Sequence, residues 1–155
     1  MTLPVSSLSI AQIRQLSAES IRSWTTDDVA TLSTGQLGAF SSSQIAALET
    51  EDIGVLSTRV SAISRSAIIG LSLAQIGVLD KFAIESLTTG QIGALTAGQI
   101  GALTSDQAEA LTANQIKMLS ATQLSALGAD DIQAFSTADI AAISYKSVQG
   151  LSPAA

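Results

Sequence analysis

The sequence predicts an all-α solenoid built from short helical segments, one for each eight-residue repeat. Three observations predict this fold class. One phrase of eight residues recurs along almost the whole chain, its second residue is of a type that begins helices, and its first and sixth residues are large and apolar. Between residues 87 and 118 the phrase reads LTTGQIGA, LTAGQIGA, LTSDQAEA and LTANQIKM. A fixed short period is the signature of repeat architectures, in which each unit packs against its neighbours.

The register of the repeat is nearly continuous. With the first residue of the phrase as position 1, octads begin at Leu8 and continue in register to Leu56. The unit at residues 56–62 is one residue short, and the register resumes at Ile63 and holds to Leu151. No linker or change of composition divides the chain. We therefore expect residues 1–155 to form a single octapeptide-repeat solenoid domain with a register slip at residues 56–62.

Position 2 indicates the backbone conformation. Apart from Glu49 it is Ser, Thr, Asp or Gly, and these residues are preferred helix N-caps because they satisfy the free N–H groups of a first turn. Position 5 is Gln or Asp in 13 of the 17 octads. The spacing Ser/Thr-x-x-Gln is that of a capping box, in which the Gln side chain reaches back to the N–H of the cap. The predicted helix caps are Thr88, Thr96, Thr104 and Thr112, with Gln91, Gln99, Gln107 and Gln115 as their partners.

The apolar residues fit the same frame, because positions 1 and 6 become the two residues of a hydrophobic staple. A continuous helix is excluded, since eight residues at about 100° each would rotate the apolar stripe by roughly 80° per repeat. We expect helical segments of about six residues, positions 3 to 8, which are too short to be stable alone and must pack against neighbouring turns. The predicted structural core includes Leu87, Ile92, Leu95, Ile100, Leu103, Leu111 and Ile116.

A β-solenoid is the alternative fold, because short Thr-rich repeats also coil in that way. Asp80 and Gly128 at position 2, the Gly residues at positions 4 and 7 and the high Ala content count against it, since these residue types are depleted in strands. The number of octads in one superhelical turn does not follow from the sequence.

Composition removes several classes of function. The net charge is −6 and no Lys/Arg cluster is present, which is a poor match for the phosphate backbone of nucleic acid. The chain has no Cys and no His, and its Gly residues follow the octad rather than a phosphate-binding loop. We expect no enzyme activity, no catalytic residues and no cofactor. No apolar run approaches the ~18 residues of a membrane span, and no signal peptide is visible at the N-terminus.

Adjacent carboxylates raise the question of calcium. They occupy positions 4 and 5 of their octads, in the first helical turn, where negative charge is favourable next to the helix dipole. No EF-type loop surrounds them, so we expect no metal site. The pairs are Asp27 with Asp28, Glu51 with Asp52, and Asp130 with Asp131.

The slip is the one irregular region. Arg59 and Arg65 lie there, and nearby Leu73 and Phe82 place large apolar groups at normally polar positions. One interpretation is a local correction of the packing. The other is an exposed interaction patch, formed by these four residues, that binds a partner or another copy of the chain.

The phrase L-[ST]-x-x-Q-I-x-A-L, which extends from about Leu8 to Leu151, resembles the tandem "LTTxQIxAL" repeats of very large, acidic, Cys-poor bacterial proteins of the secreted or cell-surface adhesin type. The resemblance implies an extracellular or cell-surface stalk, spacer or self-assembling element, and it implies no ligand. The slip and the modest length depart from that pattern.

We expect a structural, non-enzymatic protein that self-associates into homo-oligomers or filaments. Leu3 and Val5 continue the pattern, and Leu151 begins another unit, so neither end resembles a polar capping repeat. Open apolar ends can pair head to tail, and an assembly of this kind that does not close into a ring grows as a filament. The alternative is a monomeric binding module that presents one face of the solenoid to a protein or glycan.

Overall fold

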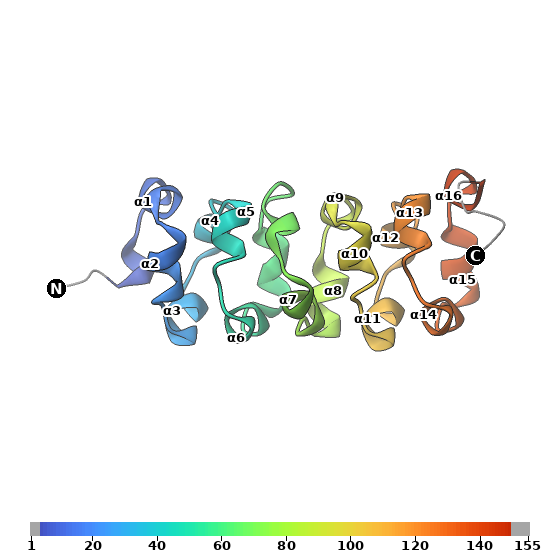
Figure 1. Cartoon of the computed structure of the whole chain (residues 1–155), viewed down its shortest axis with the longest axis horizontal. Coiled ribbons are helices and arrows are strands. Elements are labelled where there is room, and N and C mark those ends of the chain that lie inside the picture. The colour runs from blue at the N-terminus through green and yellow to red at the C-terminus, as the bar shows by residue number, and fades with distance from the viewer. Residues whose placement is uncertain (1–3, 150–155) are drawn as a thin grey trace.

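The computed structural model describes residues 4–149, which form sixteen α-helices and three 3-10 helices and contain no strand. The prediction of an all-α solenoid of short helices is confirmed, and the β-solenoid alternative is wrong for these residues. The helices follow one another along a single long axis, with α1 and α16 at opposite ends (Figure 1). Leu3 and Leu151, the expected terminal members of the pattern, lie outside the described residues.

The helices follow the octads one by one. Before the slip they are η1 (Val5–Ser7), α1 (Ile10–Gln15), α2 (Ala18–Arg22), α3 (Thr26–Ala30), α4 (Thr34–Leu37), α5 (Ser42–Ile45) and α6 (Thr50–Gly54). The slip and the octad after it form η2 (Ser57–Ala62) and η3 (Ile68–Gly70). The remainder are α7 (Leu73–Gly77), α8 (Lys81–Ser86), α9 (Thr89–Ala94), α10 (Ala97–Ile100), α11 (Ser105–Glu109), α12 (Ala113–Ile116), α13 (Ala121–Leu124), α14 (Ala129–Gln133), α15 (Thr137–Ala142) and α16 (Tyr145–Gln149).

Two extended residues interrupt the helix in each octad. Leu95 has φ −60° and ψ 144°, and Thr96 has φ −70° and ψ 160°. The helix that follows begins with a bond from the Ile100 N–H to the Thr96 carbonyl, 3.0 Å long, and closes with a tighter bond from the Leu103 N–H to the Ile100 carbonyl at 3.2 Å. Positions 1 and 2 therefore turn the chain, and one helical turn fills the rest of the octad.

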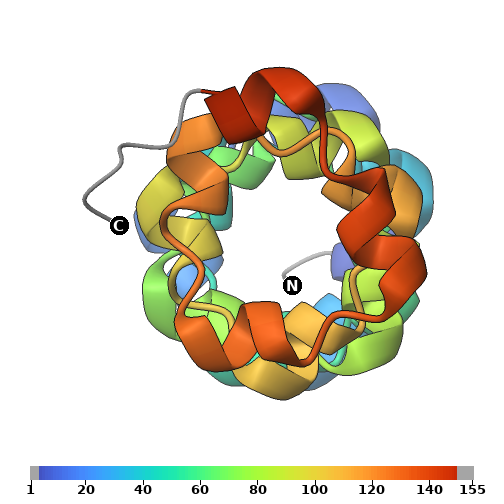
Figure 2. The ribbon, with the colours of Figure 1, turned by 90° about the vertical axis from the view of Figure 1, so that its right-hand side faces the viewer.

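Each helix packs against the helices three octads before and after it. This arrangement sorts the helices into three columns. One column contains α1, α4, η2, α8, α11 and α14, the second α2, α5, η3, α9, α12 and α15, and the third η1, α3, α6, α7, α10, α13 and α16. Viewed along the axis, the successive turns of the superhelix overlie one another and together outline a ring (Figure 2). Each column winds around the long axis. In the first column, for example, α1 and α4 lie along one side of the molecule and α11 and α14 along the opposite side (Figure 1).

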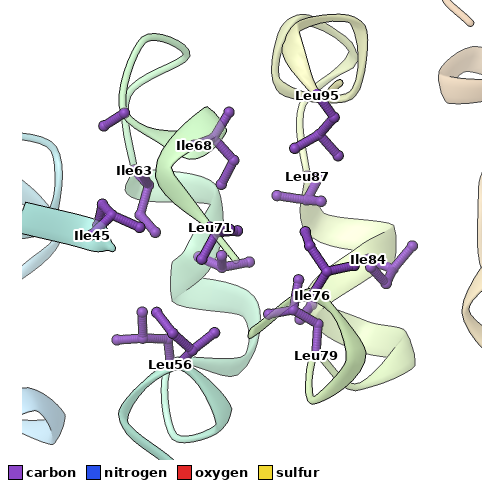
Figure 3. Packing of buried hydrophobic residues seen from close by; sticks show 14 of the residues in the cluster. Ile45, Leu56, Ile63, Ile68, Leu71, Ile76, Leu79, Ile84, Leu87 and Leu95 are labelled. Atoms are coloured by element: carbon purple, nitrogen blue, oxygen red, sulfur yellow. The ribbon is translucent and has the colours of Figure 1, made fainter. Parts of the chain in front are cut away.

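One continuous apolar cluster runs through all the turns. Positions 1 and 6 supply most of it, and the seven core residues expected between Leu87 and Ile116 are at most 6 % exposed. Figure 3 shows Ile68, Leu71, Ile76 and Leu87 gathered between successive segments of the chain. Aliphatic side chains from neighbouring turns thus bury one another, which single turns of helix could not do alone.

The slip has a different backbone. Leu56 is helical rather than extended, and Ser57 has a φ of 44°, the one positive value among the described non-glycine residues. Without an extended pair of residues to begin it, the unit forms the 3-10 helix η2 and has no side-chain cap. The Ser57 hydroxyl donates to the Asp80 carboxylate at 3.1 Å, and the Ser86 hydroxyl donates to the Thr58 carbonyl at 3.2 Å. The next turn therefore holds the irregular unit in place.

In the part of the chain that the structure describes, no helix has both the length and the apolar character that crossing a membrane would require.

Gly70 and Gly77 provide a matched test of how closely the turns approach. A Cβ added to Gly70 would lie 2.0 Å from the Ser42 carbonyl oxygen, whereas a Cβ on Gly77 would have no atom within 4 Å. We expect Gly70→Ala to lower the free energy of unfolding by about 1–3 kcal/mol, because η3 must move away from α5. Gly77→Ala should raise it by up to about 1 kcal/mol, because Ala favours the helix. Urea unfolding followed by circular dichroism measures both, and equal effects of the two changes would contradict this packing.

Candidate functional site

Glutamine side chains join one turn of the superhelix to the previous turn. The Gln107 Oε1 accepts a hydrogen bond from the N–H of its own helix cap, Thr104, at 2.9 Å. Its Nε2 donates to the carbonyls of Leu79 at 2.7 Å and Ile76 at 2.9 Å, which lie 28 and 31 residues earlier. The Leu79 carbonyl accepts no backbone hydrogen bond from the described residues. One side chain thus completes its own cap and supplies a donor to the end of a helix below it.

The same arrangement recurs in eight octads. In each, the Gln amide donates to the carbonyl of a position 1 residue one turn earlier, and the Gln side chain is 5 % exposed or less. Each glutamine and the carbonyls it bonds to are 27 to 31 residues apart in sequence, so one turn of the superhelix contains between three and four octads. We call this set the glutamine ladder, and its members are Gln36, Gln44, Gln75, Gln91, Gln99, Gln107, Gln115 and Gln123.

The ladder requires a residue that both accepts and donates. An ionised carboxylate only accepts, so Glu could complete the cap but could not bond to a carbonyl. Asp52 and Asp131, which replace Gln at position 5, show this difference. Asp131 accepts from the Gly128 N–H at 2.8 Å and from the Ser105 hydroxyl at 2.9 Å, and Asp52 accepts from the Glu49 N–H at 2.9 Å. With Asp at position 5 the hydrogen bond to the cap residue is kept, but the hydrogen bond from a side-chain amide to the previous turn is absent.

The residues expected as caps lie at the starts of α9 to α12. Thr88, Thr96, Thr104 and Thr112 each accept the backbone N–H of the Gln three residues later through Oγ1, at 3.2 to 3.4 Å. Sequence reasoning placed the glutamines in capping boxes and missed their bonds to the previous turn. The absence of Glu at position 5 was the available signal, because Glu serves a capping box as well as Gln does.

Arg59 takes the place of the missing glutamine at the slip. Its Nη1 donates to the Leu32 carbonyl at 2.7 Å, 27 residues earlier, and its side chain is half-buried. The shortened unit therefore keeps a bond to the previous turn with a longer side chain. This bond gives Arg59 a role within the fold.

The other members of the expected interaction patch are exposed but scattered. Arg65 is exposed, Leu73 is 56 % exposed and Phe82 is 55 % exposed, with the Lys81 ammonium 5.2 Å from the centre of the Phe82 ring. Arg59 and Phe82 belong to the column of η2 and α8, Leu73 to the column of α7, and Arg65 precedes η3 in the remaining column. The four residues are thus distributed around the superhelix.

An open groove of about 590 Å³ lies between α8 and α11. Asp80, Glu85, Asp106 and Glu109 line it together with Lys81, so it is mainly acidic. Asp80 is already engaged as the cap of α8, where it accepts the Ala83 N–H at 2.7 Å. Among the described residues no three acidic side chains are close enough together to hold a metal ion.

The carboxylate of Asp28, at the start of α3, is stabilised in its charged form by the cap residue Thr25. Asp28 accepts the Thr25 backbone N–H at 3.0 Å and the Thr25 hydroxyl at 2.8 Å. The backbone bond, with a smaller contribution from the hydroxyl, lowers the pKa of Asp28 below its ordinary value. The expected Asp27 and Asp28 pair is thus part of a capped first turn.

Comparison with known proteins finds the repeat. The family model described as the ALTTAQ repeat matches residues 5–42, 25–58 and 84–120, which together cover more than half of the chain. No curated protein and no solved structure matches.

Gln107 and Gln12 provide a matched test of the ladder. Gln12 accepts the Ser9 N–H at 2.8 Å but is exposed, and its amide contacts no carbonyl in residues 4–149. Gln107→Glu keeps the acceptor of the capping box and removes the donor to the previous turn. We expect it to lower the free energy of unfolding by about 2 kcal/mol or more, because two carbonyls then face a buried carboxyl group.

Gln12→Glu, the control, should change the free energy of unfolding by less than about 0.5 kcal/mol, since the cap remains and the site is exposed. Denaturant titrations of the two variants at pH 7 measure the difference. Equal free energies of unfolding for the two variants would show that the hydrogen bonds of the glutamine amides do not hold the turns together.

Proposed function

The chain belongs to the ALTTAQ repeat family, and we propose that it is a structural, non-enzymatic repeat protein that acts as a stalk, spacer or self-assembling surface element. The observation that carries this proposal is the glutamine ladder. Each ladder glutamine makes the same hydrogen bond to the turn before it, to the carbonyl of a position 1 residue. A rod of this kind can be lengthened by whole octads without a new design for its core.

A spacer must keep a fixed length, and the contacts of this chain favour that property. Each helix packs on its neighbours three octads away, and every buried side-chain nitrogen or oxygen in the described residues has a hydrogen-bond partner. The apolar cluster has buried members from Val5 to Phe135, and the ladder extends from Gln36 to Gln123. Bending or extending the rod would break the hydrogen bonds of the glutamine amides and, at the same time, expose aliphatic side chains to water.

The lack of His and Cys, and the use of position 2 hydroxyls as helix caps, support a protein without enzymatic activity. Self-association and a position outside the cell or on its surface are parts of the same proposal. Localisation rests on the resemblance of the repeated phrase to those of surface proteins. Antibody labelling of intact cells tests it, and labelling that appears only after lysis would overturn that part.

The acidic groove between α8 and α11 favours a second candidate, a monomeric module that binds a partner. A cationic peptide is the ligand whose charge its carboxylates match. An NMR titration with oligolysine would show shifts confined to α8 and α11 for this function. Shifts spread over all acidic residues would exclude it in favour of weak, unspecific attraction.

Duplication of residues 87–118, four octads, tests the spacer role. Insertion of this copy directly after Met118 keeps every octad in register, so the added segments should stack as the existing ones do. We expect the maximum dimension from small-angle X-ray scattering and the helical circular dichroism to rise together. A composition-matched scrambled insert is the control and should raise neither. An in-register copy that adds no length would contradict the proposal.

A further inference from the structure

The apolar contact between turns is complete in the middle of the superhelix. From Leu32 to Leu124, every residue at position 1 and position 6 is at most 6 % exposed. Residues at both positions are buried because each turn is covered on one side by the turn before it and on the other by the turn after it. At each end of the described chain, the terminal turn has a neighbouring turn on one side only. The apolar residues on its other side are therefore more exposed than those in the middle.

The last described turn exposes position 6. Ile140 is 46 % exposed and Val148 is 50 % exposed, although position 6 is otherwise the most deeply buried position of the repeat. Phe135, at position 1 of the same turn, is only 8 % exposed because the turn before covers it. We call this surface, Ile140 with Val148, the C-terminal face.

The first described turn exposes the opposite half. Ile13, Ile21 and Val29, at position 6, are fully buried. Position 1 of the same turn is half-buried, at Leu8, Leu16 and Trp24. We call this second set, together with Gln12, the N-terminal face.

The polar groups of the two faces are complementary as well. The Gln12 amide contacts no carbonyl among the described residues, whereas Gln36 and Gln44, at position 5 of later octads, donate to the previous turn. At the other end, the carbonyls of Phe135 and Ile143 accept no hydrogen bond from the described residues. If two C-terminal faces met, carbonyl groups would face carbonyl groups. An N-terminal face instead offers the Gln12 amide as a hydrogen-bond donor to these carbonyls.

We infer that the C-terminal face binds the N-terminal face of a second copy of this chain, head to tail, in the same way that one turn binds the next within the chain. The inference rests on the self-assembly part of the proposed function and names its partner. The occupant is a second copy because the interface continues a contact that each chain already makes many times. Such a contact joins different surfaces and does not close on itself, so it produces linear assemblies.

Blocking one face at a time tests this arrangement. Val148→Asp places a charge on the C-terminal face, and Leu8→Asp places one on the N-terminal face. Light scattering after size exclusion, over a concentration series, should show a mass that grows with concentration for the unmodified chain and a 15.8 kDa monomer for each variant alone. A charge in this apolar contact should weaken association more than about tenfold.

Mixing the two variants is the decisive step. Each retains one intact face, so a one-to-one mixture should form a dimer that does not grow further. Met118→Asp is the matched control, because Met118 is 49 % exposed in an inner turn, and it should associate as the unmodified chain does. Circular dichroism of every variant checks folding. If Leu8→Asp loses helix, the comparison of Val148→Asp with Met118→Asp decides alone.

Two results would overturn the inference. Association that persists in Val148→Asp would show that the copies meet through their sides, which leaves self-assembly standing. A strict monomer at every concentration would remove self-assembly itself, while the spacer role is measured separately through the duplication of residues 87–118.

Discussion

The primary amide of glutamine is the group on which this structure depends. A helical segment of four to six residues cannot be stable alone, because its few internal hydrogen bonds do not offset the entropy of ordering it. Here the amide oxygen of each ladder glutamine begins a helix, and its nitrogen bonds to the end of another helix one turn away. In each of these helices, the start of the helix and its packing on the turn below are therefore fixed by the same side chain.

This coupling explains how the chain tolerates a register slip. The loss of one residue at 56–62 removes both the glutamine and the extended residue pair that begins a helix. Arg59 restores the bond to the previous turn, and the hydroxyls of Ser57 and Ser86 join the irregular unit to its neighbours in the next turn. The superhelix continues through the slip because its bonds between turns continue, although the helix type changes.

Much of the fold could be predicted from the sequence, because its local signals agree with one another. Position 2 predicts the helix starts, the eight-residue period predicts the breaks, and positions 1 and 6 predict the buried residues. The three columns and the bonds of Gln107 to Leu79 and Ile76 were not predicted, because they join residues about one superhelical turn apart and depend on how far the chain advances per octad. The role of Arg59 was missed for the same reason, since nothing near it in sequence marks Leu32 as its partner.

Exchange of the glutamine side-chain amide protons, followed by NMR in deuterated water, tests the central role of the ladder most directly. If the amides bridge the turns, those of the eight ladder glutamines should exchange slowly and together with the buried backbone amides, because both require the turns to separate. The Gln12 side-chain amide should exchange rapidly, as in an unfolded peptide. Equally rapid exchange for Gln12 and for ladder members such as Gln91, Gln107 and Gln115 would contradict the account.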